Sequence, residues 1–341
     1  MAILLAAAAL LWGCRAAETR APFTDSRVPP GLESRFLPPQ GWAWGLVQPV
    51  GLPAARYGVS GPASGAKADI LILTSYGESA EVWYETTRDL NAKGYAVWVL
   101  EPVGQGGSGH YSRLRDLGYA ESLTPDVLTA KAMAETVIHR RPLILMASGT
   151  SAPVGIQAIA SGTAAEGLIL TSPRLQPDDL ATLGKAHEIQ ARGLGWLRAD
   201  LHGGWSRRGP DDRMLGLTHD QSRGKVRLAW QTANPDLRMG SPSWSWITAF
   251  ADAVQVANRD EQRLVLPVLM LEPDRARHSA RADCQRMPHC TFQPVAGADQ
   301  ALELEADAWR TAWLTKLAEF TAKSADGFSP PPGGARLPRG G

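Results

Sequence analysis

Residues 142–155 read PLILMASGTSAPVG, and this stretch decides the fold. Residues 143–146 are an apolar run, long enough for a buried strand of a parallel sheet and too short for a helix. The next five residues are small, as a sharp turn requires, and Pro153 stands where the first turn of a helix accepts a residue without an N–H. The stretch therefore predicts a strand, a tight turn with Gly149 at its apex, and a helix.

Other apolar runs predict further strands on both sides of this stretch. They cover residues 70–73, 95–100, 167–171, 266–271 and 292–296, and residues 82–90 are a helix candidate between the first two. Strands that alternate with helices are typical of an α/β fold with a mostly parallel sheet. The chain has 341 residues and 44% hydrophobic content, which is enough for one such domain with an insertion.

Four of the predicted strands are followed by conspicuous loops. Residues 74–78 read TSYGE, residues 104–109 read GQGGSG, Asp274 follows the strand at 266–271, and residues 297–305 read GADQALELE. These loops resemble those of the α/β-hydrolases, in the branch of lysophospholipases, monoglyceride lipases and serine aminopeptidases. In that branch the second of these loops, after the strand at 95–100, carries the motif Asp-x-Arg-Gly-x-Gly-x-Ser-Gly. In this chain Glu101 and Val103 replace the Asp and the Arg of the motif.

The resemblance implies an α/β-hydrolase fold over residues 41–322. We expect a mostly parallel central sheet, helices on both faces, and an inserted helical cap at about residues 177–246. Residues 234–246, NPDLRMGSPSWSW, resemble the end of the cap in the same branch. The same resemblance implies an oxyanion hole built from the backbone of Ser75, Tyr76 and Thr150.

The resemblance also assigns the three catalytic positions, and two of them hold residues that cannot act. Gly149 stands at the nucleophile position of the Gly-x-Ser-x-Gly elbow and has no oxygen to attack with. Gln300 stands at the histidine position, and an amide is not a general base near neutral pH. Asp274 is left at the acid position. The sequence therefore favours a catalytically degenerate protein that binds a lipid-like ligand or a protein partner.

An active serine hydrolase remains the alternative. Ser151 lies two residues beyond Gly149 and could serve as nucleophile, with His278 as a relocated base four residues after Asp274. Ser148 is less suited, because its neighbours are bulky for an elbow. Both hydroxyl groups could equally cap the following helix.

Residues 1–14, MAILLAAAALLWGC, predict export from the cytoplasm. The apolar run is too short to span a bilayer and suits a signal peptide. Its end resembles the lipobox of bacterial lipoproteins, which would make Cys14 the lipidated first residue of a protein anchored to a membrane of the cell envelope and facing the periplasm. An ordinary secretory signal is the alternative. Residues 14–40 would then be a tether, and residues 323–341 a disordered tail.

If Cys14 is lipidated, Cys284 and Cys290 are an even pair, and in an oxidising compartment such a pair predicts a disulfide. The cysteines lack the tight spacing of a zinc site, so we expect no metal there, and no sequence feature indicates a cofactor. A formal net charge of +1 gives no reason to expect nucleic acid as a partner.

Five of the twelve tryptophans lie in or beside the expected cap. These are Trp196, Trp205, Trp230, Trp244 and Trp246. Three roles are open to them: they line a pocket for acyl or aromatic groups, they seal the cap onto the sheet, or they dock the domain on lipid.

Overall fold

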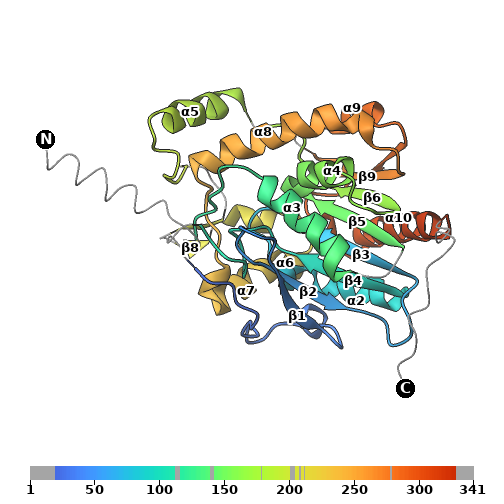
Figure 1. Cartoon of the computed structure of the whole chain (residues 1–341). Coiled ribbons are helices and arrows are strands. Elements are labelled where there is room, and N and C mark those ends of the chain that lie inside the picture. The colour runs from blue at the N-terminus through green and yellow to red at the C-terminus, as the bar shows by residue number, and fades with distance from the viewer. Residues whose placement is uncertain are drawn as a thin grey trace, which may run out of the picture.

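The computed structural model describes residues 20–111, 116–138, 142–177, 179–199, 204–206, 209–210, 212–276 and 279–327. An eight-stranded sheet runs through the middle, in the order β1-β2-β4-β3-β5-β6-β9-β10 (Figure 1). The two pairs that involve β2 are antiparallel, and all the others are parallel. The strands are β1 (Ala43–Val47), β2 (Ala55–Ser60), β3 (Ala68–Leu73), β4 (Tyr95–Leu100), β5 (Leu143–Ser148), β6 (Gly167–Thr171), β9 (Val268–Pro273) and β10 (Cys290–Val295).

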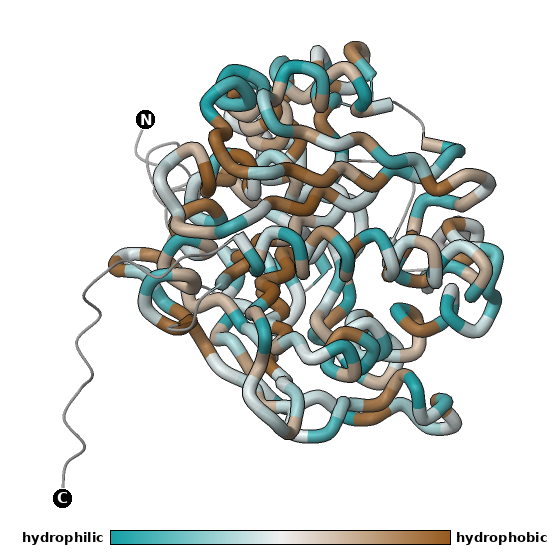
Figure 2. The backbone as a smooth tube through the Cα atoms, turned by 90° about the vertical axis from the view of Figure 1, so that its right-hand side faces the viewer, coloured by the Kyte–Doolittle hydropathy of each residue, from teal (hydrophilic) through white to brown (hydrophobic). Residues whose placement is uncertain are grey.

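Helices cover both faces of this sheet, because successive residues of its inner strands point to opposite sides. In β3, Leu71 and Leu73 pack with α3, α4 and α8, whereas Ile70 and Ile72 pack with α2 and α10. Figure 2 shows the resulting concentration of hydrophobic residues in the central strands. The helices are α2 (Tyr84–Ala92), α3 (Thr124–Ala132), α4 (Ala152–Ala160), α8 (Trp244–Asp260), α9 (Arg281–Arg286) and α10 (Asp307–Asp326).

The cap is inserted between β6 and α8. It contains α5 (Leu180–Ala191), the two-residue strands β7 (Trp205–Ser206) and β8 (Gly209–Pro210), α6 (Gln221–Gly224) and α7 (Val226–Ala233), and α5, β8 and α7 lie on the left of Figure 1. Trp244 and Trp246, expected in the cap, begin α8, which packs on the sheet. No helix of the described residues is long and apolar enough to cross a membrane.

The segment expected to be a tether is in large part folded onto the domain. Phe36 is 3% exposed and packs with Tyr84 and Trp230. Arg20 pairs with His110 through an isolated β-bridge, so the packed segment starts at the first described residue. The prediction of a tether over residues 14–40 is therefore wrong for residues 20–40, and its remainder lies outside the described residues. Likewise α10 continues to Asp326, beyond the expected start of the tail.

The two departures from the branch motif belong to the packed core. Glu101 is buried, and its carboxylate binds the Arg56 guanidinium at 2.6 and 3.0 Å and the Gly107 N–H at 2.7 Å. A Cβ on Gly106 would lie 2.5 Å from Glu101 Oε2, so the glycine-rich loop is wrapped closely around this carboxylate. Glu101 thus holds the loop in place, and Val103 contributes to the core.

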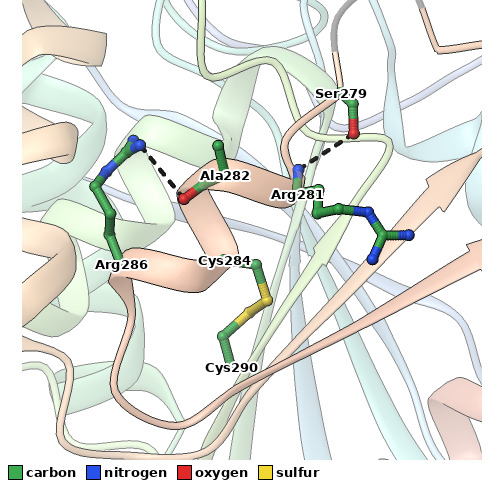
Figure 3. Close-up of a disulfide and its surroundings, with 6 residues drawn as sticks. All are labelled: Ser279, Arg281, Ala282, Cys284, Arg286 and Cys290. Atoms are coloured by element: carbon green, nitrogen blue, oxygen red, sulfur yellow. Dashed lines mark hydrogen bonds between the residues drawn. A yellow bond between two sulfur atoms is a disulfide. The ribbon is translucent and has the colours of Figure 1, made fainter.

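The predicted disulfide between Cys284 and Cys290 is confirmed. It joins α9 to the first residue of β10, with Cα atoms 5.4 Å apart (Figure 3). Cys284 is itself part of the main hydrophobic core. The bond therefore anchors α9 to the edge of the sheet.

Candidate functional site

The stretch 142–155 folds as a strand, a sharp turn and a helix. β5 ends at Ser148, one short 3-10 turn covers Gly149–Ser151, and α4 starts at Ala152. Gly149 has a φ of +50°, the left-handed region that glycine adopts without strain. Gly149 therefore occupies the apex of the turn, in the geometry of a nucleophile elbow.

The space beside this apex is taken by another side chain. A Cβ built on Gly149 would lie 2.4 Å from Ser75 Oγ and 3.0 Å from Ser75 Cβ. Ser75 follows β3, in the loop 74–78. The apex of the turn is thus a glycine, and the hydroxyl group beside it comes from the facing loop.

The backbone groups expected to form an oxyanion hole donate to side chains of the chain itself. The Thr150 N–H donates to Ser75 Oγ at 3.1 Å, and the Tyr76 N–H donates to Thr150 Oγ1 at 2.8 Å. The Ser75 N–H donates to Glu78 Oε2 at 3.0 Å. An oxyanion hole needs donors aimed at the position where charge develops. In this arrangement all three donors are already engaged.

The two alternative serines lie close to the elbow, and no histidine of the described residues pairs with them. Ser151 is 7% exposed, and its hydroxyl group donates to the Thr74 carbonyl at 2.5 Å. Ser148 is the last residue of β5 and lines the large cavity described below. Among the described residues, no histidine is hydrogen-bonded to either serine. His278, the expected substitute base, and Cys14 lie outside the described residues.

Gln300 and Asp274 follow the last two strands, but they are held differently. Gln300 lines the same cavity as Gly149. Its backbone carbonyl oxygen accepts a hydrogen bond from the Ser172 hydroxyl group at 2.7 Å. Asp274 is exposed directly after β9, and its Oδ2 accepts from the Gly297 N–H at 3.4 Å. The structure therefore brings together the nucleophile and histidine positions in one cavity, and it places the Asp274 carboxylate on the Gly297 loop.

Among the histidines that the structure describes, His219 is held by two acidic side chains. Its Nδ1 lies 2.8 Å from Glu305 Oε1, its Nε2 lies 3.4 Å from Asp299 Oδ2, and its ring stacks on Trp309. These three polar side chains are close enough to hold a metal ion. However, the Glu305 carboxylate already accepts the N–H groups of Asp299, His219 and Ala306. We therefore infer that this cluster has a structural role, because it connects the cap to the loop 297–305.

A cavity of about 620 Å³ extends from the elbow to the cap. Its apolar wall is formed by α5 and α8, where Trp246 stacks on Phe250 with ring centroids 5.3 Å apart. Trp230 is buried in α7, Trp244 is buried between α8 and α5, Trp205 is half-buried and Trp196 is 45% exposed. Of the five tryptophans, only Trp246 lines this cavity within the described lining.

Ionisable groups also line the cavity. Glu303 is 4% exposed, and burial, followed by the repulsion of Glu78, raises its pKa to about 8. Burial also raises the pKa of Glu78 and lowers the pKa of Arg227. A cavity of this size, with one apolar wall and a few polar groups, is suited to a ligand that has both kinds of surface.

A family model described as serine aminopeptidase, S33, matches residues 64–287, which is most of the chain. The chain belongs to this family. No curated protein sequence matches it. The S33 assignment agrees with the fold and with the motifs after β3, β4 and β5.

Solved structures show the same fold at low sequence identity. Monoglyceride lipase from Saccharomyces cerevisiae, solved with a substrate analogue, is 15% identical, with a TM-score of 0.64 over 84% of this chain and 97% of that chain. Monoacylglycerol lipase from Paleococcus ferrophilus is 14% identical, with a TM-score of 0.62 over 79% and 99%. A carboxyl esterase from Bacillus coagulans is 13% identical, with a TM-score of 0.64 over 84% and 100%. The chain therefore has the α/β-hydrolase fold.

The sequence reasoning missed three residues of this S33 site. Ser75 is expected from the sequence to contribute only its backbone, whereas its side chain meets the elbow. Arg227 and Glu303 had no signal in the sequence, because they come from α7 and from the loop before α10 and meet only in the folded cavity.

Proposed function

We propose that this protein binds a lipid-like ligand in the cavity beneath its cap and does not use the serine-hydrolase mechanism of its family. The observation that carries this proposal is the position of the Ser75 side chain. It fills the space of a nucleophile at Gly149 and accepts the hydrogen bond of the Thr150 N–H. A substrate carbonyl would have to displace it to reach the oxyanion donors.

The nature of the ligand follows from the cavity and from the structural neighbours. The apolar wall includes Leu183, Met239, Trp246 and Phe250, which suits a hydrocarbon chain. Neighbours of the same fold are lipases and esterases. We therefore infer an acyl or alkyl group as the apolar part of the ligand.

Labelling with a fluorophosphonate probe tests the absence of hydrolase chemistry. We expect no labelling of the wild type or of the variants Ser151→Ala and Ser75→Ala under conditions that label an active esterase. Labelling that is lost only in Ser151→Ala would overturn the proposal and establish the alternative, an active esterase or lysophospholipase that uses Ser151 with a base such as His278.

Binding is tested separately with a fluorescent acyl probe. We expect saturable binding to the wild type and at least a fivefold loss in Trp246→Ala, because this side chain forms part of the apolar wall and truncating an aromatic anchor typically costs more than 1 kcal/mol. The matched control is Trp196→Ala, which removes an exposed tryptophan of the cap. Equal affinity of all three proteins would place the ligand elsewhere.

We also propose that the protein is lipidated at Cys14 and faces the periplasm. The support is the sequence of residues 1–14, together with the disulfide, which fits an oxidising compartment. Metabolic labelling with a palmitate analogue should mark the wild type and not Cys14→Ser, and only the wild type should sediment with membranes. Equal sedimentation of the two without labelling would contradict the anchor.

A further inference from the structure

The walls of the large cavity hold more acidic groups than basic ones. The carboxyl side chains that line it are Glu78, Asp179 and Glu303, and the guanidinium side chains are Arg174 and Arg227. Arg174 and Asp179 follow β6 in the chain, whereas Glu78, Arg227 and Glu303 form a trio whose charges act on one another. Within the described lining, acidic groups therefore exceed basic groups by one.

The side chains of Arg174 and Asp179 are both engaged by neighbouring residues. The Arg174 guanidinium lies 5.6 Å from the centroid of the Phe250 ring. The Asp179 carboxylate caps α5 by accepting the Thr182 N–H at 2.6 Å and the Thr182 hydroxyl at 2.7 Å. These two opposite charges balance each other in number. The excess carboxyl group is therefore in the trio.

Within the trio, the positions of Glu78 and Arg227 are fixed by the loop 74–78. Glu78 accepts the Ser75 N–H, and Arg227 Nη2 donates to the Tyr76 carbonyl at 3.2 Å. Arg227 Nε is fully enclosed and has no hydrogen-bond partner in the described part of the chain. The carboxylate of Glu78 and the guanidinium of Arg227 attract each other.

Glu303 is the third member, and among the described residues only its own backbone N–H donates to its carboxyl group, which the guanidinium groups of Arg310 and Arg227 also attract. Glu303 is only 4% exposed against a cavity wall, yet no other residue of the described ranges donates a hydrogen bond to it. Buried carboxylates are normally paired or hydrogen-bonded, because an isolated buried charge is costly. The high pKa of Glu303 means that, near neutral pH, a proton neutralises this carboxyl group in the empty cavity. One site for a positive charge is thus filled by a proton.

We propose that the cavity binds a cationic amphiphile, with a single ammonium head between Glu303 and Glu78 and a hydrocarbon tail along Trp246 and Phe250. As the ammonium head binds, the Glu303 carboxyl group releases its proton to solvent and becomes the counter-ion. An anionic head could pair with Arg227 but would face both carboxyl groups. This inference rests on the proposed function, because it names the head group of the same ligand.

The experiment compares three amphiphiles of equal chain length, dodecylamine, dodecanol and dodecanoate, each below its aggregation concentration. Affinity and heat are measured by titration calorimetry near neutral pH in two buffers of different ionisation enthalpy. We expect dodecylamine to bind at least about tenfold more tightly than dodecanol, as one charge-assisted hydrogen bond would give. Binding of the amine, and not of the alcohol, should release protons.

The variant Glu303→Gln should lower the affinity for dodecylamine about tenfold, abolish proton release, and leave dodecanol binding unchanged. Glu319→Gln, an exposed change on α10, controls for the loss of one negative charge. If no amphiphile binds, the proposed function itself fails. If dodecanol matches dodecylamine, or dodecanoate binds most tightly, the cationic head is wrong and lipid binding stands. The comparison on the wild-type protein decides this even if Glu303→Gln does not fold.

Discussion

Placing a serine at the elbow tests whether the Ser75 side chain fills the place of a nucleophile. In Gly149→Ser, the new Cβ would lie 2.4 Å from Ser75 Oγ on a backbone with φ of +50°. The left-handed backbone costs a residue with a Cβ about 1–2 kcal/mol. Displacing Ser75 also removes its hydrogen bond with Thr150, which contributes about 1 kcal/mol. We expect the variant to lose about 2–3 kcal/mol of unfolding free energy.

The compensating change is Ser75→Gly. Alone it should cost about 1–2 kcal/mol, because it leaves the Thr150 N–H without its acceptor and adds a flexible glycine. In the double variant the introduced side chain no longer overlaps with the residue at position 75, and the Thr150 hydrogen bond is lost only once. The double variant should therefore be about 1–2 kcal/mol more stable than the sum of the two single changes indicates.

Urea unfolding followed by tryptophan fluorescence measures all four free energies. The matched control is Gly162→Ser: Gly162 also has a positive φ, of +92°, but its Cβ would have no atom within 4 Å. This change should cost only backbone strain and should be additive with Ser75→Gly. If Gly149→Ser and Ser75→Gly are also additive, to within about 0.5 kcal/mol, the two side chains do not share one space and the reasoning is refuted.

Three further changes probe other parts of the structure. Replacing Cys284 and Cys290 by alanine should lower the free energy of unfolding by about 2 kcal/mol, since the closed loop is short; urea denaturation of oxidised and reduced wild type provides the comparison, and an unchanged midpoint would contradict it. Phe36→Ala should cost about 3–4 kcal/mol, because this side chain is 3% exposed, whereas a free tether would show no change in thermal midpoint. Glu303 binds its proton more tightly in the folded chain than in the unfolded chain, so the stability of the wild type should fall as pH rises from about 4.5 to about 8. Glu303→Gln should flatten this pH dependence, measured as urea midpoints across the same range. Parallel curves for the two proteins would argue against a buried neutral acid.

The fold could be predicted from the sequence because its signals are local. The run at residues 143–146 and the small residues after it define β5 and the turn without reference to the rest of the chain. The disulfide followed from counting cysteines and from the compartment that residues 1–14 indicate. The prediction that Gly149 and Gln300 stand at the nucleophile and histidine positions rests on the glycine-rich motifs, which fix the alignment on both sides.

What could not be predicted depends on contacts between distant residues. Ser75 and Gly149 are far apart in the sequence, and only the folded sheet brings β3 and β5 side by side. Residues 20–40 are rich in proline and polar residues, a composition typical of a linker. Phe36 anchors this segment by packing against Tyr84 and Trp230, which come together only in the folded chain. The pairing of His219 with Glu305 likewise joins the cap to the last loop across 86 positions.

The close contact between positions 75 and 149 also affects the order in which a serine at the elbow could be gained by single substitutions. A chain with serine at both positions has two side chains in one space. A chain with glycine at both positions has an unoccupied pocket and a Thr150 N–H without its present acceptor. By the changes in unfolding free energy expected above, serine at both positions costs about 2–3 kcal/mol and glycine at both about 1–2 kcal/mol, so a serine at position 149 is gained at lower cost if Ser75 is replaced first.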